Sequence, residues 1–369
     1  MRPVWAEIDV AKFVHNLRQL RKAAGGTDLM AVVKADAYGH GAVPLARAAV
    51  EAGARYLGVA IVEEGVELRE AGITAPILVL GASPPEQALM VVEYNLTQTV
   101  ASPELVRALG EAAGQRGRIA LVHLKLETGM GRIGVAPGPQ LDSLLTEIQA
   151  TPGIRLEGVF THLAAADQAD QTYSRLQMRA FESGLRQVQA AGFRGIIRHV
   201  SNSAGIIALP GARYDLVRAG ISLYGYFPSS EVRRDLDLRP VLSWKARISH
   251  VKEVPAGYSV GYGCTYHTQY PTTIATVPLG YADGFPRLLS NRGEVLVRGV
   301  RCQLVGRVCM DQIMLDVGKI DGVQSGEEAV IIGQQGNERL TADDLARGVG
   351  TISYEILTGI QKRVPRVYR

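Results

Sequence analysis

Apolar runs of strand length alternate with helical patterns through the first two-thirds of this 369-residue chain. Several runs are continuously apolar, which is typical of parallel strands that are covered on both faces. Eight strands are expected, at residues 29–34, 56–61, 77–80, 96–100, 119–126, 156–161, 197–201 and 215–219. Eight strand and helix units in tandem predict an α/β fold of the (β/α)8 TIM-type barrel class. A doubly wound open sheet is the alternative, although no GxGxxG turn follows any of these strands.

Helical patterns fill the intervals between the strands. Helices are expected over residues 10–24, after a short extended start, and over 42–52, 63–71, 85–94, 103–113, 140–150 and 170–191. The alternation stops at residues 229–240, a charged stretch that has no continuous apolar run and ends in proline. We interpret this stretch as a linker.

Beyond the linker the segments become short and β-rich. Strands are expected at residues 241–254, 272–279, 294–297, 302–308, 313–317 and 329–332. Helix is expected only near 341–357, where Thr341 followed by Asp344 is typical of a helix start. The chain is therefore expected to have two domains, a barrel over residues 1–235 and a mostly β domain over residues 236–369.

Composition limits the classes of partner. A hydrophobic content of 47% with 21% charged residues indicates a large buried core and argues against disorder. The net charge of +4 is small, and no basic run with interleaved aromatic residues occurs, so nucleic acid is not an expected partner. Neither a spanning apolar run nor a signal-peptide pattern is present, which predicts a cytoplasmic protein without membrane contact.

The three cysteines, Cys264, Cys302 and Cys309, lie in the last third of the chain without CxxC spacing. Their odd number and their spacing argue against a disulfide framework and against a metal site. They are expected to be small buried side chains.

Lys34 lies at the mouth of the first expected strand, before a turn that Gly39 and Gly41 indicate. A lysine there is either a solvated charge or an amine held at a concave site for covalent chemistry with a carbonyl. The solvated charge is the commoner case for a single lysine. Later segments favour the second interpretation, because they predict groups that would hold a cofactor bearing a phosphate and a carbonyl.

Polar residues follow the seventh and eighth strands, where barrels of this type commonly hold phosphate. Asn202 and Ser203 precede a helix start, whose free N–H groups favour an anion. Gly220 follows Arg218 and lets backbone amides approach closely. Asn202 and Ser203 would also form a helix N-cap, worth about 1 kcal/mol, and the two roles are compatible.

Two other strand ends have candidate side chains. Strand five leads into a loop with glycines that would aim Arg132 at a carboxylate through two parallel hydrogen bonds, although a lone arginine near glycines is more often a surface charge. Strand six ends at His162, for which structural and functional roles are equally expected. His162 and His199, at adjacent strand ends, are candidates to transmit the electrostatic influence of the Arg218 charge to an acid/base group of the site.

Seven motifs in order give the chain a resemblance to bacterial alanine racemases. They are the lysine stretch at 31–41, LETGMGRIG at 126–134, SNSAG at 201–205, VRAGISLYG at 217–225, VGYGCTY at 260–266, GYADGFPR at 280–287 and GRVCMDQ at 306–312. The resemblance covers essentially the whole chain. It implies a fold type III enzyme with an N-terminal barrel and a C-terminal β domain, a homodimer, and pyridoxal 5′-phosphate. The barrel prediction is independent of this resemblance, whereas the identity of the cofactor depends on it.

The resemblance also implies the roles of individual residues. Lys34 would form the internal aldimine and act as one catalytic base, and Tyr262 of the neighbouring subunit would be the second. Arg218 would face the pyridine nitrogen. The expected cofactor-binding residues are Lys34, Tyr38, His162, Asn202, Ser203, Arg218, Gly220, Ile221 and Tyr354.

Further residues are implied around the substrate. Arg132 and Met310 would bind its carboxylate, and Tyr281 would line the entrance. Lys125 matches a lysine that is carbamylated in many family members, and an unmodified lysine is the alternative. No metal is implied.

The implied reaction is the interconversion of L- and D-alanine, with D-alanine supplied for peptidoglycan. Inverting an α-carbon requires removing a proton from one face and returning one to the other, so two acid/base groups on opposite faces suit it. Lysine and tyrosine are poor bases at neutral pH unless neighbours shift their pKa values. The alternatives are a racemase for serine or for a broader range of amino acids, a decarboxylase of the same architecture, and a non-catalytic carrier of pyridoxal phosphate.

Overall fold

The computed structural model describes residues 3–369 and divides into two compact units. The barrel unit comprises residues 13–37 and 42–239, and the C-terminal unit comprises residues 3–12, 38–41 and 240–369. Among the described residues, no helix combines the length and the apolar character that crossing a membrane requires.

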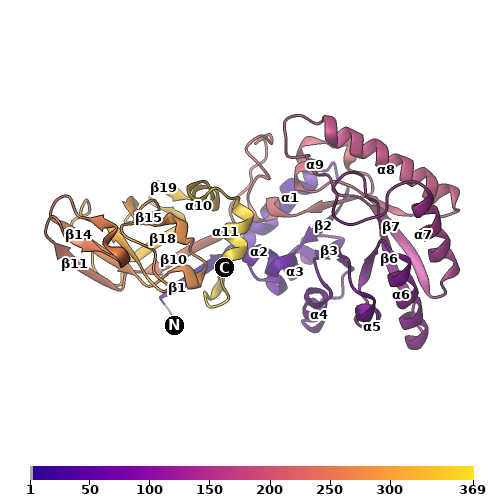
Figure 1. The fold of residues 1–369 in the computed structure, drawn as a ribbon, viewed down its shortest axis with the longest axis horizontal. Coiled ribbons are helices and arrows are strands. Elements are labelled where there is room, and N and C mark those ends of the chain that lie inside the picture. The colour runs from indigo at the N-terminus through magenta and orange to yellow at the C-terminus, as the bar shows by residue number, and fades with distance from the viewer. Residues whose placement is uncertain (1–2) are drawn as a thin grey trace. The chain divides into compact units, whose positions relative to one another are not determined.

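Eight parallel strands form the core of the barrel unit (Figure 1). They are β2 (Asp28–Val32), β3 (Tyr56–Val59), β4 (Ile77–Val79), β5 (Thr97–Val100), β6 (Ala120–Lys125), β7 (Ile154–Phe160), β8 (Ile197–His199) and β9 (Leu216–Ala219). Each strand from β2 to β8 pairs with the next, and β9 pairs with β2. Two backbone hydrogen bonds, Asp215 N to Arg198 O at 3.1 Å and Arg218 N to Ser201 O at 2.9 Å, link β9 to the region of β8. The predicted (β/α)8 barrel is confirmed.

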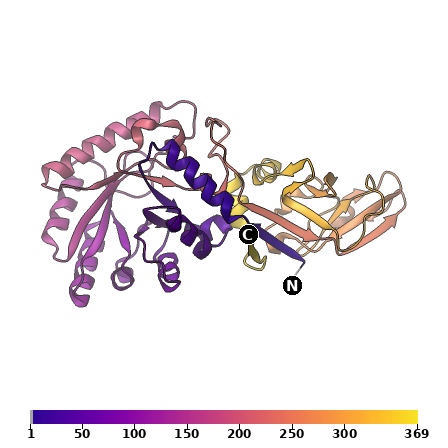
Figure 2. The ribbon, with the colours of Figure 1, turned by 180° about the vertical axis from the view of Figure 1, so that it is seen from behind.

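The helices of this unit lie outside its strands (Figures 1 and 2). They include α3 (Ala42–Glu51), α4 (Val62–Glu70), α5 (Ala88–Glu93), α6 (Pro103–Arg116), α7 (Pro139–Ala150), α8 (Thr172–Ala190) and α9 (Ser203–Ala208). The longer helices bury one face, as α6 does with Leu105, Leu109 and Ala113, whereas the short α9 is almost wholly buried. Two further helices, α1 (Val10–Ala23) and α2 (Lys34–Gly39), cross the division between the units.

The C-terminal unit is mostly β, as expected. Its largest sheet has the order β16-β15-β18-β10-β1-β20, with β19 paired to β18, and a second sheet has the order β11-β14-β17. The large sheet comprises β1 (Val4–Ile8), β10 (Leu242–Arg247), β15 (Glu294–Val297), β16 (Val300–Gln303), β18 (Glu328–Gln335), β19 (Glu338–Leu340) and β20 (Arg366–Tyr368). The remaining strands are β11 (His250–Val254), β12 (Ser259–Val260), β13 (Tyr266–His267), β14 (Thr272–Val277) and β17 (Ile313–Asp316).

The short extended start expected at the N-terminus is a strand of this unit, β1, which pairs with β10 and β20. Two other expectations require correction. The expected strand over 241–254 is divided into β10 and β11. The expected helix near 341–357 is divided into α10 (Ala342–Val349) and α11 (Ser353–Gly359), because Gly350 has φ of 76° and ends α10 in the left-handed conformation.

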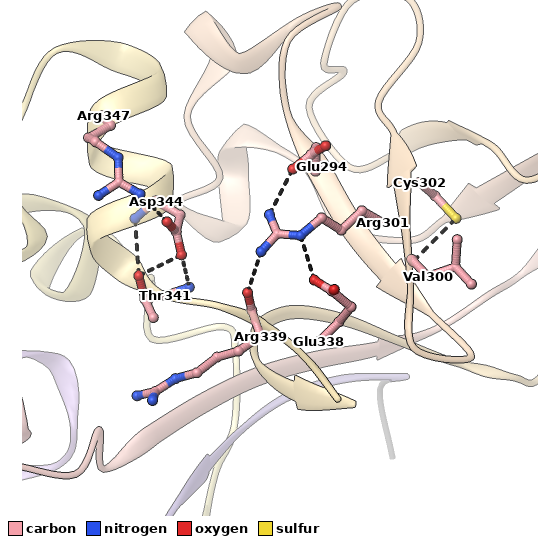
Figure 3. A network of polar contacts seen from close by, with 9 residues as sticks. All are labelled: Glu294, Val300, Arg301, Cys302, Glu338, Arg339, Thr341, Asp344 and Arg347. Carbon is pink, nitrogen blue, oxygen red and sulfur yellow. Dashed lines mark hydrogen bonds and ion pairs between the residues drawn. The ribbon is translucent and has the colours of Figure 1, made fainter. Parts of the chain in front are cut away.

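A surface network joins strands of the large sheet (Figure 3). Arg301 of β16 donates to Glu294 of β15 at 2.9 Å and to Glu338 of β19 at 2.7 Å. Nearby, Thr341 accepts from the backbone N–H of Asp344 at 3.2 Å, while the Asp344 carboxylate accepts from the N–H of Thr341 at 2.7 Å. This capping box begins α10 and confirms the helix start expected there.

The cysteines differ from one another in exposure. Cys302 is buried, as expected, whereas Cys309 is partly exposed and Cys264 is exposed. The expectation of burial was wrong for Cys264 because it lies in a 3-10 turn, Tyr262–Cys264, on the surface of its unit.

Candidate active site

Lys34 begins a left-handed helical turn at the carboxyl end of β2. Ala35, Asp36, Ala37 and Tyr38 all have φ between 51° and 53°. For residues other than glycine this conformation costs about 1–2 kcal/mol each. Four such residues in a row are a concentration of backbone strain, which is typical of a functional site.

The Glu64 carboxylate stabilises the start of this turn. Its Oε1 accepts from the backbone N–H of Ala35 at 2.6 Å, and its Oε2 accepts from that of Ala60 at 2.7 Å. The Asp36 carboxylate then accepts from the N–H of Ala42 at 2.7 Å, at the start of α3. Sequence reasoning expected a glycine turn here and missed Glu64, which lies on α4.

The amine of Lys34 is in an environment that favours its neutral form. Burial lowers the pKa of Lys34, and the positive charges of Arg132 and Arg218 lower it further, while Glu64 acts in the opposite direction. A lysine with a lowered pKa is the stronger nucleophile and base at neutral pH. The strand-end lysine is therefore suited to covalent chemistry with a carbonyl.

Arg218 is the central buried cation of the barrel unit, at 3% exposure. Its guanidinium donates to the backbone carbonyls of Thr161 at 2.7 Å, Val200 at 2.9 Å and His199 at 3.0 Å. It also contacts two imidazoles, with Nη1 2.9 Å from His199 Nδ1 and Nη2 3.4 Å from His162 Nδ1. Burial, with a contribution from Arg132, lowers the pKa of Arg218 to about 9.

His199 is buried and His162 is half-buried, and the surroundings of both favour the neutral imidazole. Burial and the charge of Arg218 hold the pKa of each well below its ordinary value. His199 Nε2 lies 2.8 Å from Nδ1 of His123, a residue of β6 that sequence reasoning did not select. No local motif marks His123, since its importance arises only where β6 and β8 bring the two imidazoles together.

Lys125, at the end of β6, is 2% exposed. Its Nζ lies 5.0 Å from the centroid of the Phe160 ring and has no hydrogen-bond partner within residues 3–369. Burial lowers the pKa of Lys125 to about 7, and Arg218 and Arg132 contribute to the shift. Buried polar groups in native proteins usually have a hydrogen-bond partner, so a buried amine that has none calls for an explanation.

The loop after β6 positions Arg132. The Glu127 carboxylate accepts from the backbone N–H groups of Gly129, Gly131 and Arg132, the latter two at 3.0 and 3.4 Å. Burial opposes ionisation of Glu127, but these backbone hydrogen bonds lower its pKa overall. The loop therefore has a fixed backbone, from which the exposed Arg132 side chain projects.

The residues of the expected phosphate cradle lie after β8 and β9. Ser203 Oγ accepts from the N–H of Gly220 at 2.9 Å and lies 3.5 Å from that of Ser222, so two backbone donors point at one place. Ser222 Oγ is buried without a partner in the described part of the chain. Asn202 Oδ1 accepts from the N–H of Gly205 at 2.9 Å and caps α9. Ser203 Oγ, which accepts from these N–H groups, still has a proton to donate, and together with the unsatisfied Ser222 hydroxyl it suits an anion such as a phosphate.

Of the remaining candidate residues, Ile221 is buried in the barrel unit, and the others belong to the C-terminal unit. The rings of Tyr38 and Tyr354 lie 6.1 Å apart. The backbone N–H groups of Tyr281 and Ala282 donate to the carbonyls of Cys309 and Met310, at 3.1 and 3.0 Å, so these two turns are adjacent.

Three of these side chains are exposed within the single chain. Tyr262 is 72% exposed, Met310 is 53% exposed and Tyr281 is 41% exposed. Tyr262 follows Gly261, whose φ of 77° requires glycine.

Comparisons with known proteins give concordant results. The family model for the alanine racemase N-terminal domain matches residues 8–228, and that for the C-terminal domain matches residues 241–368. The alanine racemase of Symbiobacterium thermophilum is 51% identical over 368 residues, which cover 100% of this chain and 97% of that protein.

Solved structures are also similar. The alanine racemase of Clostridium difficile 630 has a TM-score of 0.95 and 40% identity, covering 100% of this chain and 96% of that one. The alanine racemase of Bartonella henselae, solved with covalently bound pyridoxal phosphate, has a TM-score of 0.90 and 30% identity over 100% of both chains.

Proposed function

The chain belongs to the alanine racemase family, and from this premise we propose that it interconverts L- and D-alanine with pyridoxal 5′-phosphate as its cofactor. The observation that supports this function most directly is the placement of the Lys34 amine, with its lowered pKa, at the same barrel end as the buried Arg218 guanidinium. An amine with a lowered pKa suits covalent attachment to the cofactor carbonyl and proton transfer.

The residues present fit the cofactor. The Gly220 and Ser222 amides donate to Ser203 Oγ and leave its proton free to donate, and the unpartnered Ser222 hydroxyl lies on the same turn; these two hydroxyls suit the phosphate. Asn202, Ile221, Tyr38 and Tyr354 complete the proposed set of phosphate-side residues, and His162 lies beside Arg218. The cofactor supplies a conjugated ring that withdraws electrons from the substrate's α-carbon.

Two residues of the chain would move the proton. Lys34 takes or returns it on one face of the α-carbon, and Tyr262 of a second copy does so on the other, so one proton leaves as another arrives. The 72% exposure of the Tyr262 side chain supports its use by a second copy in a homodimer with shared sites. Arg132 and Met310 bind the substrate carboxylate, and Tyr281 lines the entrance.

We propose that Lys125 is carbamylated. Its buried, unpartnered amine has a pKa lowered to about 7, so a neutral fraction exists near neutral pH. The neutral Nζ attacks the carbon of CO2, one proton is released, and the resulting carbamate carries one negative charge. That anion would balance Arg132 and hold its guanidinium. Intact-protein mass spectrometry with and without added bicarbonate measures the modification.

The domain division and the cellular context are also proposals. A boundary at 235/236 is supported by the two family matches, which end and begin at residues 228 and 241. The presence of three free cysteines favours a reducing compartment such as the cytoplasm, where D-alanine would supply peptidoglycan synthesis. Cell fractionation tests this location.

The decisive experiment measures D-alanine formed from L-alanine by the purified full-length protein loaded with pyridoxal phosphate. Conversion to an equal mixture is expected, with Lys34→Ala as the inactive control. Comparison of kcat/KM for alanine and serine distinguishes a serine racemase. Retention of the cofactor without turnover would instead indicate a carrier, and release of CO2 would indicate a decarboxylase.

A further inference from the structure

A chain of buried polar side chains extends from Arg218 into the barrel interior. Arg218 Nη1 lies 2.9 Å from His199 Nδ1, His199 Nε2 lies 2.8 Å from His123 Nδ1, and His123 Nε2 lies 3.2 Å from Glu157 Oε2. Both imidazoles are 0% exposed. We call these four residues the histidine chain.

The direction of the histidine chain follows from the chemistry of its first member. A guanidinium donates hydrogen bonds and accepts none, so His199 Nδ1 must accept. A neutral His199 then has its proton on Nε2 and donates it to His123 Nδ1. His123 in turn has its proton on Nε2 and donates to the Glu157 carboxylate.

Both imidazoles must be neutral in this arrangement. A second proton on His123 Nδ1 would require His199 Nε2 to accept while its Nδ1 also accepts from Arg218, leaving that ring with no proton. Burial independently lowers the pKa of both His123 and His199. Every hydrogen bond in the chain therefore has the same polarity, from cation to carboxylate.

Glu157 is the carboxylate that accepts the last hydrogen bond of the histidine chain. Within residues 3–369 no ion pair joins Arg218 to a carboxylate, and its other hydrogen bonds go to backbone carbonyls and to the His162 imidazole. Burial opposes ionisation of Glu157, but hydrogen bonds from His123 and Tyr56 lower its pKa overall, with Arg155 nearby. The chain thus links an otherwise uncompensated buried cation to an anion.

The strands are built to bring these groups together. The pairing of β6 with β7 shifts between Val122↔Leu156 and His123↔Gly158, so Glu157 is an extra residue that the bulge re-aims. A Cβ on Gly158 would lie 2.5 Å from the His123 ring. The absence of a side chain at residue 158 therefore makes room for His123.

We propose that Glu157 and His123 are positioning residues for Arg218, fixing the orientation of its guanidinium and balancing its charge through the histidine chain. The consequence for the cofactor rests on the proposed function, in which Arg218 faces the pyridine nitrogen. The geometry of the histidine chain does not depend on that assignment.

Nitrogen NMR of the full-length protein labelled at histidine tests the chain directly, both without pyridoxal phosphate and after loading. His123 and His199, assigned by substitution among the seven histidines, should remain neutral Nε2–H tautomers from about pH 6 to pH 8.5 while exposed histidines titrate. Either residue observed as an Nδ1–H tautomer or as an imidazolium in the wild type would overturn the proposal.

Two substitutions separate the negative charge of Glu157 from its ability to accept a hydrogen bond. Glu157→Leu removes the acceptor, so the His123 Nε2–H loses its partner and the His123 signals should move, while both tautomers, which the Arg218 end of the chain determines, should persist. Glu157→Gln keeps an acceptor oxygen and should restore the wild-type His123 signals. Asp237→Asn is the matched control, because Asp237 pairs with His15 at 3.1 Å without contacting the histidine chain, and it should leave both signals unchanged. Unchanged signals in Glu157→Leu would contradict the proposal.

A double-mutant cycle measures the link to the cofactor through its dissociation constant. Glu157→Leu should weaken pyridoxal phosphate binding about tenfold when Arg218 is present and less than about twofold in an Arg218→Gln background. Equal losses in both backgrounds would contradict action through Arg218. Absence of racemase activity in the wild type would overturn the proposed function alone, since the NMR result would still decide the histidine chain.

Discussion

Four of the proposed site residues differ in exposure between the two units of the molecule. In the barrel unit Lys125 and Arg218 are 2% and 3% exposed, whereas in the C-terminal unit Tyr262 and Met310 are 72% and 53% exposed. Buried groups have pKa values and orientations that their own barrel determines. The environment of Lys125 and Arg218 is therefore preorganised within one chain. Under the proposed function, Tyr262 would complete its environment only against a second copy of the chain.

The largest effect is expected from removal of the exposed phenol of Tyr262, which tests the difference between the two units most strongly. Tyr262→Phe should lower kcat by about 10²–10⁴-fold or more, because the second acid/base group is lost while the barrel groups stay intact. Cofactor absorbance and the melting temperature should stay at wild-type values. Measurement of both racemisation directions checks this, and undiminished turnover would show that the barrel unit alone performs catalysis.

Changing the buried cation tests the barrel side. Arg218→Glu should lower the racemisation rate by about 10²–10³-fold, because a fixed donor is lost and a carboxylate would favour protonation of the cofactor's ring nitrogen. Side products such as those of transamination should increase. Chromatography of the products checks the ratio of pyruvate to D-alanine, and equal product purity in the variant would refute the role of Arg218.

Lys125 allows the cost of burial to be measured. Its pKa is lowered from 10.5 to about 7 in the folded protein, so the unfolded chain binds more protons between those values and stability should rise with pH across that window. Lys125→Met removes this penalty. In CO2-free buffer at pH 7 the variant should therefore be more stable by up to about 5 kcal/mol, with the gain vanishing toward pH 10.5. Denaturant unfolding measures the free energy of unfolding of both proteins across this pH range. Equal values for the wild type and Lys125→Met at every pH would refute the lowered pKa of Lys125.

The left-handed turn provides a smaller effect. Glu64→Gln replaces one of two acceptor oxygens with a donor, so the N–H of Ala35 or of Ala60 loses its partner at a cost of about 1–3 kcal/mol. Faster amide exchange at Ala35 and about a tenfold lower kcat are expected. Glu63→Gln, on the same helical turn, is the control and should behave as wild type. Unchanged exchange in Glu64→Gln would show that the turn does not need the carboxylate.

The smallest effect is expected on the surface of the C-terminal unit. Arg301 is 38% exposed, and its partners Glu294 and Glu338 are 46% and 45% exposed. Arg301→Met should lower the free energy of unfolding by no more than about 1 kcal/mol, because solvent and salt weaken exposed ion pairs. A loss above about 2 kcal/mol in thermal unfolding would show that this region is more strongly coupled than its exposure indicates.

Local pattern predicted the barrel well because its strands and helices alternate along the chain. The continuous apolar runs placed all eight strands to within a few residues, and the rule that sites form at strand ends selected Lys34 and Arg218. The pairing of β1 with β20 escaped prediction, since it joins residues at opposite ends of the chain. The left-handed turn also escaped prediction, because Ala35 to Tyr38 contains no glycine to indicate it.

The amino-acid sequence by itself determined the fold class, the family motifs and the chemical types available at the strand ends, because these depend on periodicity and on residue identity. Only the tertiary structure decided which polar groups meet. His123 and Glu157 are unremarked strand residues until a bulge in β7 and the side-chain-free Gly158 bring them into line with His199. The physical reason is that hydrogen bonds and burial depend on distances of about 3 Å across separate strands, which sequence spacing alone does not specify.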